Sequence, residues 1–248
     1  MNNKNNTEKK YALITGAAKR IGASITENLH TNGFDVGIHF NSSSKDAENL
    51  CNRLNALRKN SAKIFQGNIT KSEGINLLYK EFFKWSGKID LLVNNASSFY
   101  PTPLGEINDE NWDDLIGTNL KGPLFLCQAA HNDLKKQQGS IINLIDIYIK
   151  SPPKDHSVYI AAKAGLEIVT RSLARDLAPD VRVNGISPGA ILWPEKNMDN
   201  KTKEGILNTI PLKRKGSPQD IADCVLFLVK TSNYITGQII SIDGGKSI

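Results

Sequence analysis

The stretch that decides the fold lies near the N-terminus, where residues 11–22 read YALITGAAKRIG. The apolar run at 11–15 predicts a buried strand, and apolar residues at helical spacing predict a helix over 21–32. The small residues between them, beginning at Gly16, predict a tight turn. Such a turn lets backbone N–H groups and the positive end of the helix approach an anion such as a pyrophosphate.

The alternation of strand and helix continues to the C-terminus. Apolar runs predict strands at 11–15, 35–40, 63–66, 90–94, 139–145, 181–186 and 238–242. Helical spacing predicts helices at 21–32, 45–59, 71–83, 110–136 (bent near Gly122 and Pro123), 157–177 and 218–229. This order predicts an α/β fold: one doubly wound Rossmann-type domain over 10–248, with a central, mostly parallel sheet of about seven strands. Residues 1–9 are predicted to form a mobile polar tail.

Composition narrows the class of protein. Hydrophobic residues make up 40% of the 248 residues, and no apolar run approaches the roughly 20 residues of a membrane span. The net charge is +6, but basic and acidic residues are interleaved, which favours a phosphate-rich small ligand over nucleic acid. Three scattered cysteines and the absence of a secretory signal predict reduced thiols, no metal site and a cytoplasmic location.

The end of the second predicted strand bears on the choice of cofactor. Sheets that bind NAD usually place an acid there to hold the ribose 2′-hydroxyl. Here Asp35 lies at the other end of that strand, and Asp46 lies in the following helix. The segment after the strand is HFNSSSK at 39–45, and its amide, hydroxyls and lysine, together with Lys19, suit a 2′-phosphate. These residues predict NADPH rather than NADH.

A tyrosine and a lysine, Tyr159 and Lys163, lie four residues apart on the predicted helix 157–177 and therefore share one face of it. A nearby ammonium stabilises a phenolate, so the lysine is expected to lower the pKa of the tyrosine from its usual value of about 10. A tyrosine tuned in this way can act in acid–base catalysis. Because such pairs are common on helices, the hypothesis depends on the glycine turn and the strand order found with it.

Together these features resemble the short-chain dehydrogenase/reductase family from Tyr11 to Gly245. The matching stretches are TGAAKRIG at 15–22, NNA at 94–96, YIAAK at 159–163 and VNGISPG at 183–189. The resemblance implies that Tyr159 is the acid/base and that Lys163 lowers its pKa and binds the nicotinamide ribose. It also implies that Asn119 holds a water in a proton relay. The predicted cofactor-binding residues are Gly16, Lys19, Arg20, Ile21, His39, Asn41, Ser42, Ser43, Asn68, Ile69, Asn95, Ala96, Ser97, Tyr159, Lys163, Pro188 and Gly189.

Four positions depart from the family pattern. Arg20 and Ser97 stand where glycine is usual, Asn68 replaces a frequent aspartate, and Asp146 stands at the place of the family's serine. An ionised carboxylate at that place would repel the alkoxide that forms when a ketone is reduced. Reduction of a C=N bond instead requires a proton at nitrogen, which a carboxyl with a pKa raised by burial can share with Tyr159. Asp146 therefore favours a ring imine as the substrate.

Within the family, the stretches TGAAKRIG, NNASSFYPTPL and INLID resemble pteridine reductases, including the dihydromonapterin reductase branch. This resemblance implies NADPH-dependent reduction of biopterin, dihydromonapterin or folate-type rings to the tetrahydro form. The predicted substrate-binding residues are Arg20, Ser97, Phe99, Asp146, Tyr159 and Trp193, with a substrate loop over 191–209 in which Trp193 and Pro194 are lid candidates. The resemblance also implies a homotetramer built on helices near 111–130 and 157–177.

Two alternatives remain open from the sequence. The first is an NADPH-dependent carbonyl reductase, such as a 3-oxoacyl reductase, that carries Asp146. The second is a non-catalytic NADP-binding protein, which the intact Tyr159, Lys163 and Asn119 disfavour.

Overall fold

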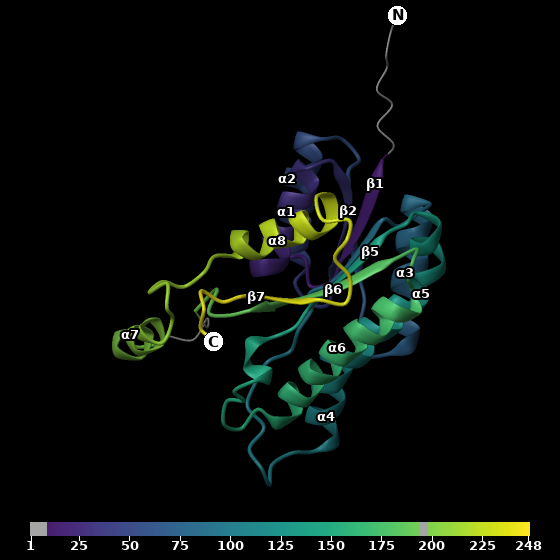
Figure 1. The fold of residues 1–248 in the computed structure, drawn as a ribbon. Coiled ribbons are helices and arrows are strands. Elements are labelled where there is room, and N and C mark those ends of the chain that lie inside the picture. The colour runs from purple at the N-terminus through teal and green to yellow at the C-terminus, as the bar shows by residue number, and fades with distance from the viewer. Residues whose placement is uncertain (1–8, 194–197) are drawn as a thin grey trace, which may run out of the picture.

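The computed structural model describes residues 9–193 and 198–248, and a parallel β-sheet runs through its centre (Figure 1). The strands lie in the order β3-β2-β1-β4-β5-β6-β7, and all described neighbours pair in parallel. The predicted doubly wound sheet is confirmed, with every pair parallel rather than most. The strands are β1 (Lys10–Ile14), β2 (Phe34–Phe40), β3 (Ala62–Gln66), β4 (Leu91–Asn94), β5 (Ser140–Leu144), β6 (Arg182–Pro188) and β7 (Ile239–Ile242).

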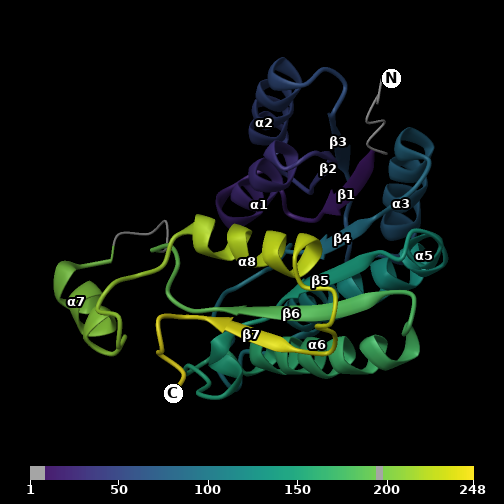
Figure 2. The same cartoon turned by 45° about the horizontal axis from the view of Figure 1, so that its top comes forward.

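Helices cover both faces of the sheet (Figure 2). Side chains alternate along β1, so that Ala12 and Ile14 join one apolar core and Leu13 joins the other. The first core is closed by α1 (Arg20–Thr31), α2 (Ser44–Leu57) and α8 (Pro218–Lys230). The second core is closed by α3 (Ser72–Ser86), α5 (Gly122–Lys136) and α6 (Ser157–Asp176). The described elements thus form three layers, helix, sheet and helix.

The long helix predicted over 110–136 is divided into three parts. The helix α4 (Asp109–Ile116) leads into a π-helical turn (Gly117–Lys121), and α5 follows. The irregular segment therefore precedes the expected bend at Gly122 and Pro123. Its wide turn passes close to the loop after β3, where a Cβ on Gly117 would lie 2.8 Å from Cβ of Thr70. Such π-turns often mark functional positions, and this one contains Asn119.

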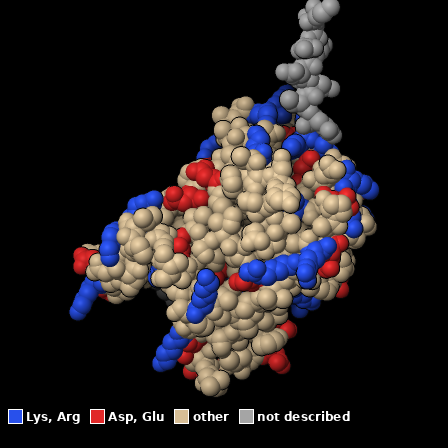
Figure 3. Space-filling view, viewed as in Figure 1, with Lys and Arg blue, Asp and Glu red and all other residues tan. Residues whose placement is uncertain are grey.

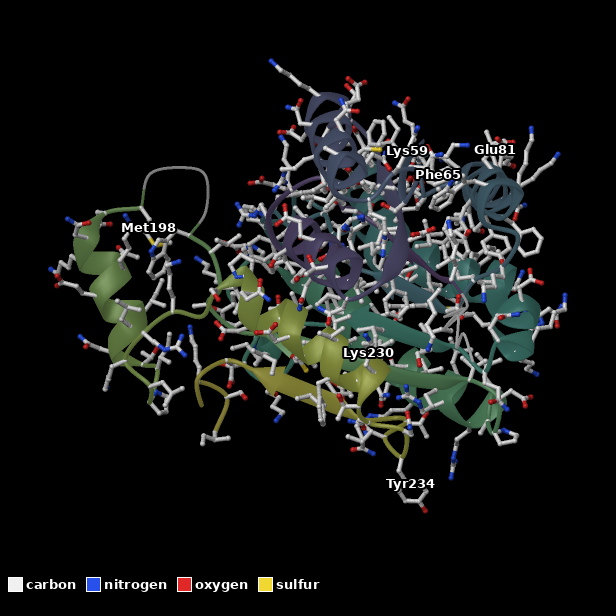
Figure 4. All side chains as sticks on the ribbon, turned by 90° about the horizontal axis from the view of Figure 1, so that it is seen from above. Lys59, Phe65, Glu81, Met198, Lys230 and Tyr234 are labelled. Atoms are coloured by element: carbon white, nitrogen blue, oxygen red, sulfur yellow. The ribbon has the colours of Figure 1, made fainter. Side chains whose placement is uncertain are left out.

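One α-helix was not predicted from the sequence, and neither was a short 3-10 helix over Ile147–Ile149. The helix α7 (Asn200–Asn208) projects from the body of the molecule (Figure 1) and begins where the Asp199 carboxylate accepts a hydrogen bond from the backbone N–H of Thr202, at 2.8 Å. No described residue of α7 is buried, so the sequence carries no apolar stripe that would reveal it. Met198, labelled in Figure 4, precedes it. The lid candidate Pro194 lies outside the described residues.

The surface shows no large field of one sign on the face drawn in Figure 3, where basic and acidic side chains are interleaved. The three cysteines are free, with Cys127 buried and the other two half-buried. None of the described helices has the length and apolarity that crossing a membrane requires. Among the described residues, no group of three or more side chains is arranged to hold a metal ion.

Candidate active site

The turn after β1 is fastened to the loop after β4. The Asn95 side-chain amide donates to the carbonyls of Thr15 and Gly16 at 2.9 and 3.0 Å. The Thr15 hydroxyl accepts from the backbone N–H groups of Asn95 and Ala96 at 2.9 and 3.0 Å. Gly16 has a φ of +59°, and a Cβ on it would lie 2.8 Å from Cα of Ala96. The two motifs that the sequence analysis singled out therefore form one rigid platform.

The platform faces a cavity of about 570 Å³. The side chain of Lys19, the residue before α1, does not cap that helix, and the first turn carries no acid, so this helix start suits an anion. Arg20, the residue in the glycine position, adopts a left-handed φ of +54° at the start of this helix. A dinucleotide fits this donor set, because a pyrophosphate needs both a close backbone and a positive helix end.

The cavity gathers thirteen of the predicted cofactor-binding residues, from the turn after β1, the end of β2 and the loops after β3 and β4. They are Gly16, Lys19, Arg20, Ile21, His39, Asn41, Ser42, Ser43, Asn68, Ile69, Asn95, Ala96 and Ser97. Also lining it, and not predicted, are Thr70, Ser98, Asp113, Asp114 and Thr118. Asp113, Asp114 and Thr118 come from α4 and the π-turn, whose position against the cavity depends on packing rather than on a local motif.

Both ring nitrogens of His39 are hydrogen-bonded to backbone groups, so neither is left to bind a ligand. Its Nδ1 accepts from the N–H of Gly16 at 3.2 Å, and its Nε2 lies 3.0 Å from the carbonyl of Gly67, to which it donates. Burial lowers the pKa of His39 to about 4, so the ring is neutral at physiological pH. The imidazole therefore shapes the cavity by joining β2 to the turn after β1 and to the end of β3.

Lys19 is held at the mouth of the same cavity by an acid that the sequence analysis set aside. Its ammonium lies 3.1 Å from the Asp46 carboxylate, and both side chains are about half exposed. Ser43, the residue before α2, does not cap that helix with its side chain. Lys19, the Ser43 hydroxyl and the start of α2 are thus available to a phosphate, while Asp46 competes for the lysine.

A second cavity of about 410 Å³ continues from the first, and Arg20, Ile21, Asn95 and Ser97 line both. It contains the remaining predicted site residues except Asn119: Phe99, Asp146, Tyr159, Lys163, Pro188, Gly189 and Trp193. Tyr148 was not predicted to line it, whereas Leu192, Met198 and Ile206 belong to the predicted substrate loop 191–209. Ile206 belongs to α7, and Tyr148 follows Asp146 closely enough that the INLIDIY stretch could have suggested it.

Tyr159 and Asp146 form a hydrogen-bonded pair in this second cavity. The phenol donates to one carboxylate oxygen of Asp146 at 2.7 Å, and the other accepts from the N–H of Tyr148 at 2.9 Å. Burial raises the pKa of Tyr159 well above its usual range, and the charge and hydrogen bond of Asp146 raise it further. A smaller opposing effect comes from the Ser97 hydroxyl. Tyr159 is therefore a phenol, the form that can donate a proton.

The expectation that Lys163 lowers the pKa of Tyr159 is wrong for the protein without cofactor. The Lys163 ammonium donates to the carbonyl of Leu144 at 2.8 Å and lies 5.8 Å from the centre of the tyrosine ring. Desolvation lowers its own pKa to about 8, although Asp146 opposes this shift. Burial of the phenol is the largest cause of the upward shift, the Asp146 carboxylate that contacts the phenol is the next, and Lys163 is not among the causes.

Asn119 lies behind the site, fully buried in the π-turn. Its side-chain oxygen accepts from the Ser97 hydroxyl at 2.6 Å, and its nitrogen donates to the carbonyls of Ser98 and Leu115 at 2.9 Å each. Ser97 thereby lies between Asn119 and Tyr159. A role for Asn119 in a proton relay stays a prediction, because its amide is engaged by protein groups on both sides.

The geometry agrees with comparisons to known proteins. A family model described as Enoyl-(Acyl carrier protein) reductase matches residues 16–247. Pteridine reductase 1 of Leishmania tarentolae is 37% identical, with 96% of each chain covered. A 3-oxoacyl-acyl-carrier-protein reductase of Staphylococcus epidermidis is 36% identical over 95% of this chain and 98% of its own length. The chain belongs to the short-chain dehydrogenase/reductase family. As a short-chain reductase it is an oxidoreductase that works with a nicotinamide cofactor.

The buried lysine of this short-chain reductase gives a test by stability. Its pKa falls from 10.5 to about 8 on folding, so the unfolded chain binds more protons between these values. Its presence therefore destabilises the fold most below pH 8, and this cost disappears as the pH rises toward 10.5. Lys163→Met removes the group. In urea unfolding without cofactor, the free energy of unfolding of wild type should rise by about 1–3 kcal/mol relative to that of Lys163→Met between pH 8 and pH 10.5. A difference that is constant with pH would contradict the assignment.

Proposed function

We propose that the chain is an NADPH-dependent pteridine reductase that reduces a pterin or dihydropterin ring, such as biopterin, dihydromonapterin or a folate, to the tetrahydro form. The observation that carries the proposal is the carboxylate of Asp146 accepting the phenol hydrogen bond of Tyr159 at 2.7 Å. At this place the family pattern has a serine, whose hydroxyl donates to a carbonyl oxygen. A carboxylate repels a developing alkoxide but is suited to handling a proton for a ring nitrogen.

The proton chemistry follows from this pair. The platform around Gly16 would hold NADPH, which would supply the hydride for the carbon of the C=N bond. The ring nitrogen must gain one proton, and the phenol of Tyr159 is the acid that faces the cavity in its protonated form. Once the phenol has given up its proton, the pair of Tyr159 and Asp146 holds none, and the Lys163 ammonium, 5.8 Å from the centre of the tyrosine ring, offsets part of the negative charge that results. The pair then regains the donated proton from water.

The preference for NADPH rests on Lys19, Ser42 and Ser43 at the cavity mouth and on the lack of an acid after β2. Lys19→Ala is expected to raise the Kd for NADPH about three- to tenfold, a range set by solvent screening of a half-exposed ammonium, and to leave the Kd for NADH nearly unchanged. Asp46→Asn should have the opposite effect, because it removes the competitor for Lys19. Fluorescence titration of wild type and both variants with both cofactors measures the six affinities, and equal losses for NADPH and NADH in Lys19→Ala would contradict this preference.

A substrate panel tests the reaction itself. NADPH oxidation is followed with biopterin, dihydromonapterin, dihydrofolate and an acetoacetyl thioester, at equal concentrations of the purified protein. Turnover of a pterin with little or none of the thioester supports the proposal. Turnover of the thioester alone would overturn it in favour of a carbonyl reductase, the second candidate, which the 36% identity to 3-oxoacyl reductases supports. Binding of NADPH without any turnover would favour the non-catalytic alternative.

We also propose a cytoplasmic homotetramer, built on α4, α5 and α6. Two large apolar side chains are partly exposed on these helices, Trp112 at 49% on α4 and Ile168 at 64% on α6. Self-association through both helices would bury them. Light scattering after gel filtration measures the assembly, and a monomer at micromolar concentration would refute it.

A further inference from the structure

Phe99 is a large apolar side chain that stays in solvent beside the reacting groups. The residue is 55% exposed, yet it lines the second cavity together with Asp146 and Tyr159. An exposed ring gains little from burial, so its orientation must come from specific contacts. Those contacts come from the start of α6.

His156, the residue that precedes α6, stacks on the Phe99 ring. The ring centres lie 4.6 Å apart and the planes differ by 21°. Tyr159, three residues further along, meets Phe99 edge to face, with centres 4.8 Å apart and planes at 78°. Among the described residues, the cavity lining includes Phe99 and Tyr159 but not His156. The imidazole therefore supports the phenyl ring from outside the cavity.

The imidazole is itself fixed. Its Nδ1 donates to the backbone carbonyl of Lys154 at 2.6 Å, which sets the plane of the ring. A separate backbone hydrogen bond joins the same two loops, from the N–H of Thr102 to the carbonyl of Asp155 at 2.5 Å. Loss of the imidazole should thus leave the loops joined and free only the Phe99 side chain to rotate.

We propose that His156 is a positioning residue that holds the Phe99 ring at the cavity, so that the site favours a flat heteroaromatic substrate over a flexible acyl chain. An oriented ring offers a stacking face without the entropy cost of ordering it on binding. The substrate class in this inference rests on the proposed function, whereas the positioning of Phe99 does not.

The test separates binding from chemistry. His156→Ala is expected to raise KM for the pterin about three- to tenfold, the value of one aromatic contact, with most of the loss of kcat/KM carried by KM. His156→Phe, which can still stack, should restore KM. His131→Ala is the matched control, because His131 also donates from Nδ1 to a backbone carbonyl, that of Gln128, but lies on α5. An unchanged KM in His156→Ala, or no rescue by His156→Phe, would overturn the proposal.

A second measurement works without any substrate. The chain has four histidines, and the imidazole signal that is lost in His156→Phe identifies His156 in a proton NMR spectrum. Stacking on Phe99 shifts that signal by ring current, and Phe99→Leu should remove the shift. If wild type turns over no pterin, the proposed function fails, and this signal alone decides the positioning role. A His156 signal that does not move in Phe99→Leu would overturn that role.

Discussion

Replacing Tyr159 with phenylalanine is expected to lower kcat for the pterin about 10²–10⁴-fold, the usual contribution of a positioned acid. In the proposed mechanism the phenol is the proton donor; it faces the cavity, and burial and Asp146 keep it protonated. Phenylalanine retains the ring that packs against Phe99 but loses the hydrogen bond to Asp146. The Kd for NADPH, measured by fluorescence titration, should therefore change little.

A matched control exists elsewhere in the chain. Tyr79 on α3 donates to a carboxylate oxygen of Asp133 at 2.9 Å, and burial raises its pKa as it does for Tyr159. Tyr79→Phe removes a similar Tyr–Asp hydrogen bond outside the two cavities that form the candidate site, so turnover should stay close to that of wild type. A loss in Tyr159→Phe no larger than that in Tyr79→Phe would show that the phenol of Tyr159 is not the acid.

Most of the fold could be predicted because the inner strands β2, β4 and β5 are buried on both faces. Such strands appear as short apolar runs, and all seven lie within two residues of their predicted ends. The helix α7 could not be predicted, since none of its described residues is buried. The π-turn at Gly117–Lys121 was also missed, because it arises where α4 and α5 pass close to Thr70, a contact between segments far apart in the sequence.

In the site, too, the residues in local motifs could be predicted, whereas the contacts between distant segments could not. Spacing along strands and helices was enough to bring Gly16, Asn95 and Tyr159 to one edge of the sheet. The partner of Lys19 and the two backbone bonds of His39 depend on how α2 and β3 pack, and no motif encodes them. The direction of the pKa shift of Tyr159 was wrong for a related reason. Sequence spacing places Lys163 near the ring but cannot show that the ammonium is held by the carbonyl of Leu144.

Replacing Asp146 with serine is expected to weaken pterin reduction and to strengthen reduction of a carbonyl substrate. The variant carries the hydroxyl of the family pattern, which can donate to a carbonyl oxygen but cannot share a proton with a ring nitrogen. We expect kcat for the pterin to fall about 10²–10⁴-fold and turnover of an acetoacetyl thioester to rise. Asp146→Asn should lose pterin turnover without this gain, since it removes the charge and keeps one acceptor oxygen, which can serve Tyr159 or the N–H of Tyr148 but not both. Steady-state assays with both substrates measure the exchange.

Asp146→Ser also distinguishes the effect of the carboxylate on the pKa of Tyr159 from the effect of burial. Burial is the largest cause of the raised pKa of Tyr159, and Asp146 is the second. Asp146→Ser should therefore lower the pKa of Tyr159 only in part, so that phenolate absorbance appears at lower pH than in wild type but still above the usual range. Tyr159→Phe identifies the absorbance that belongs to this tyrosine. A pKa that stays unchanged in Asp146→Ser, together with full pterin turnover, would mean that the carboxylate does not act on the phenol, and the case for a ring imine would lose its support.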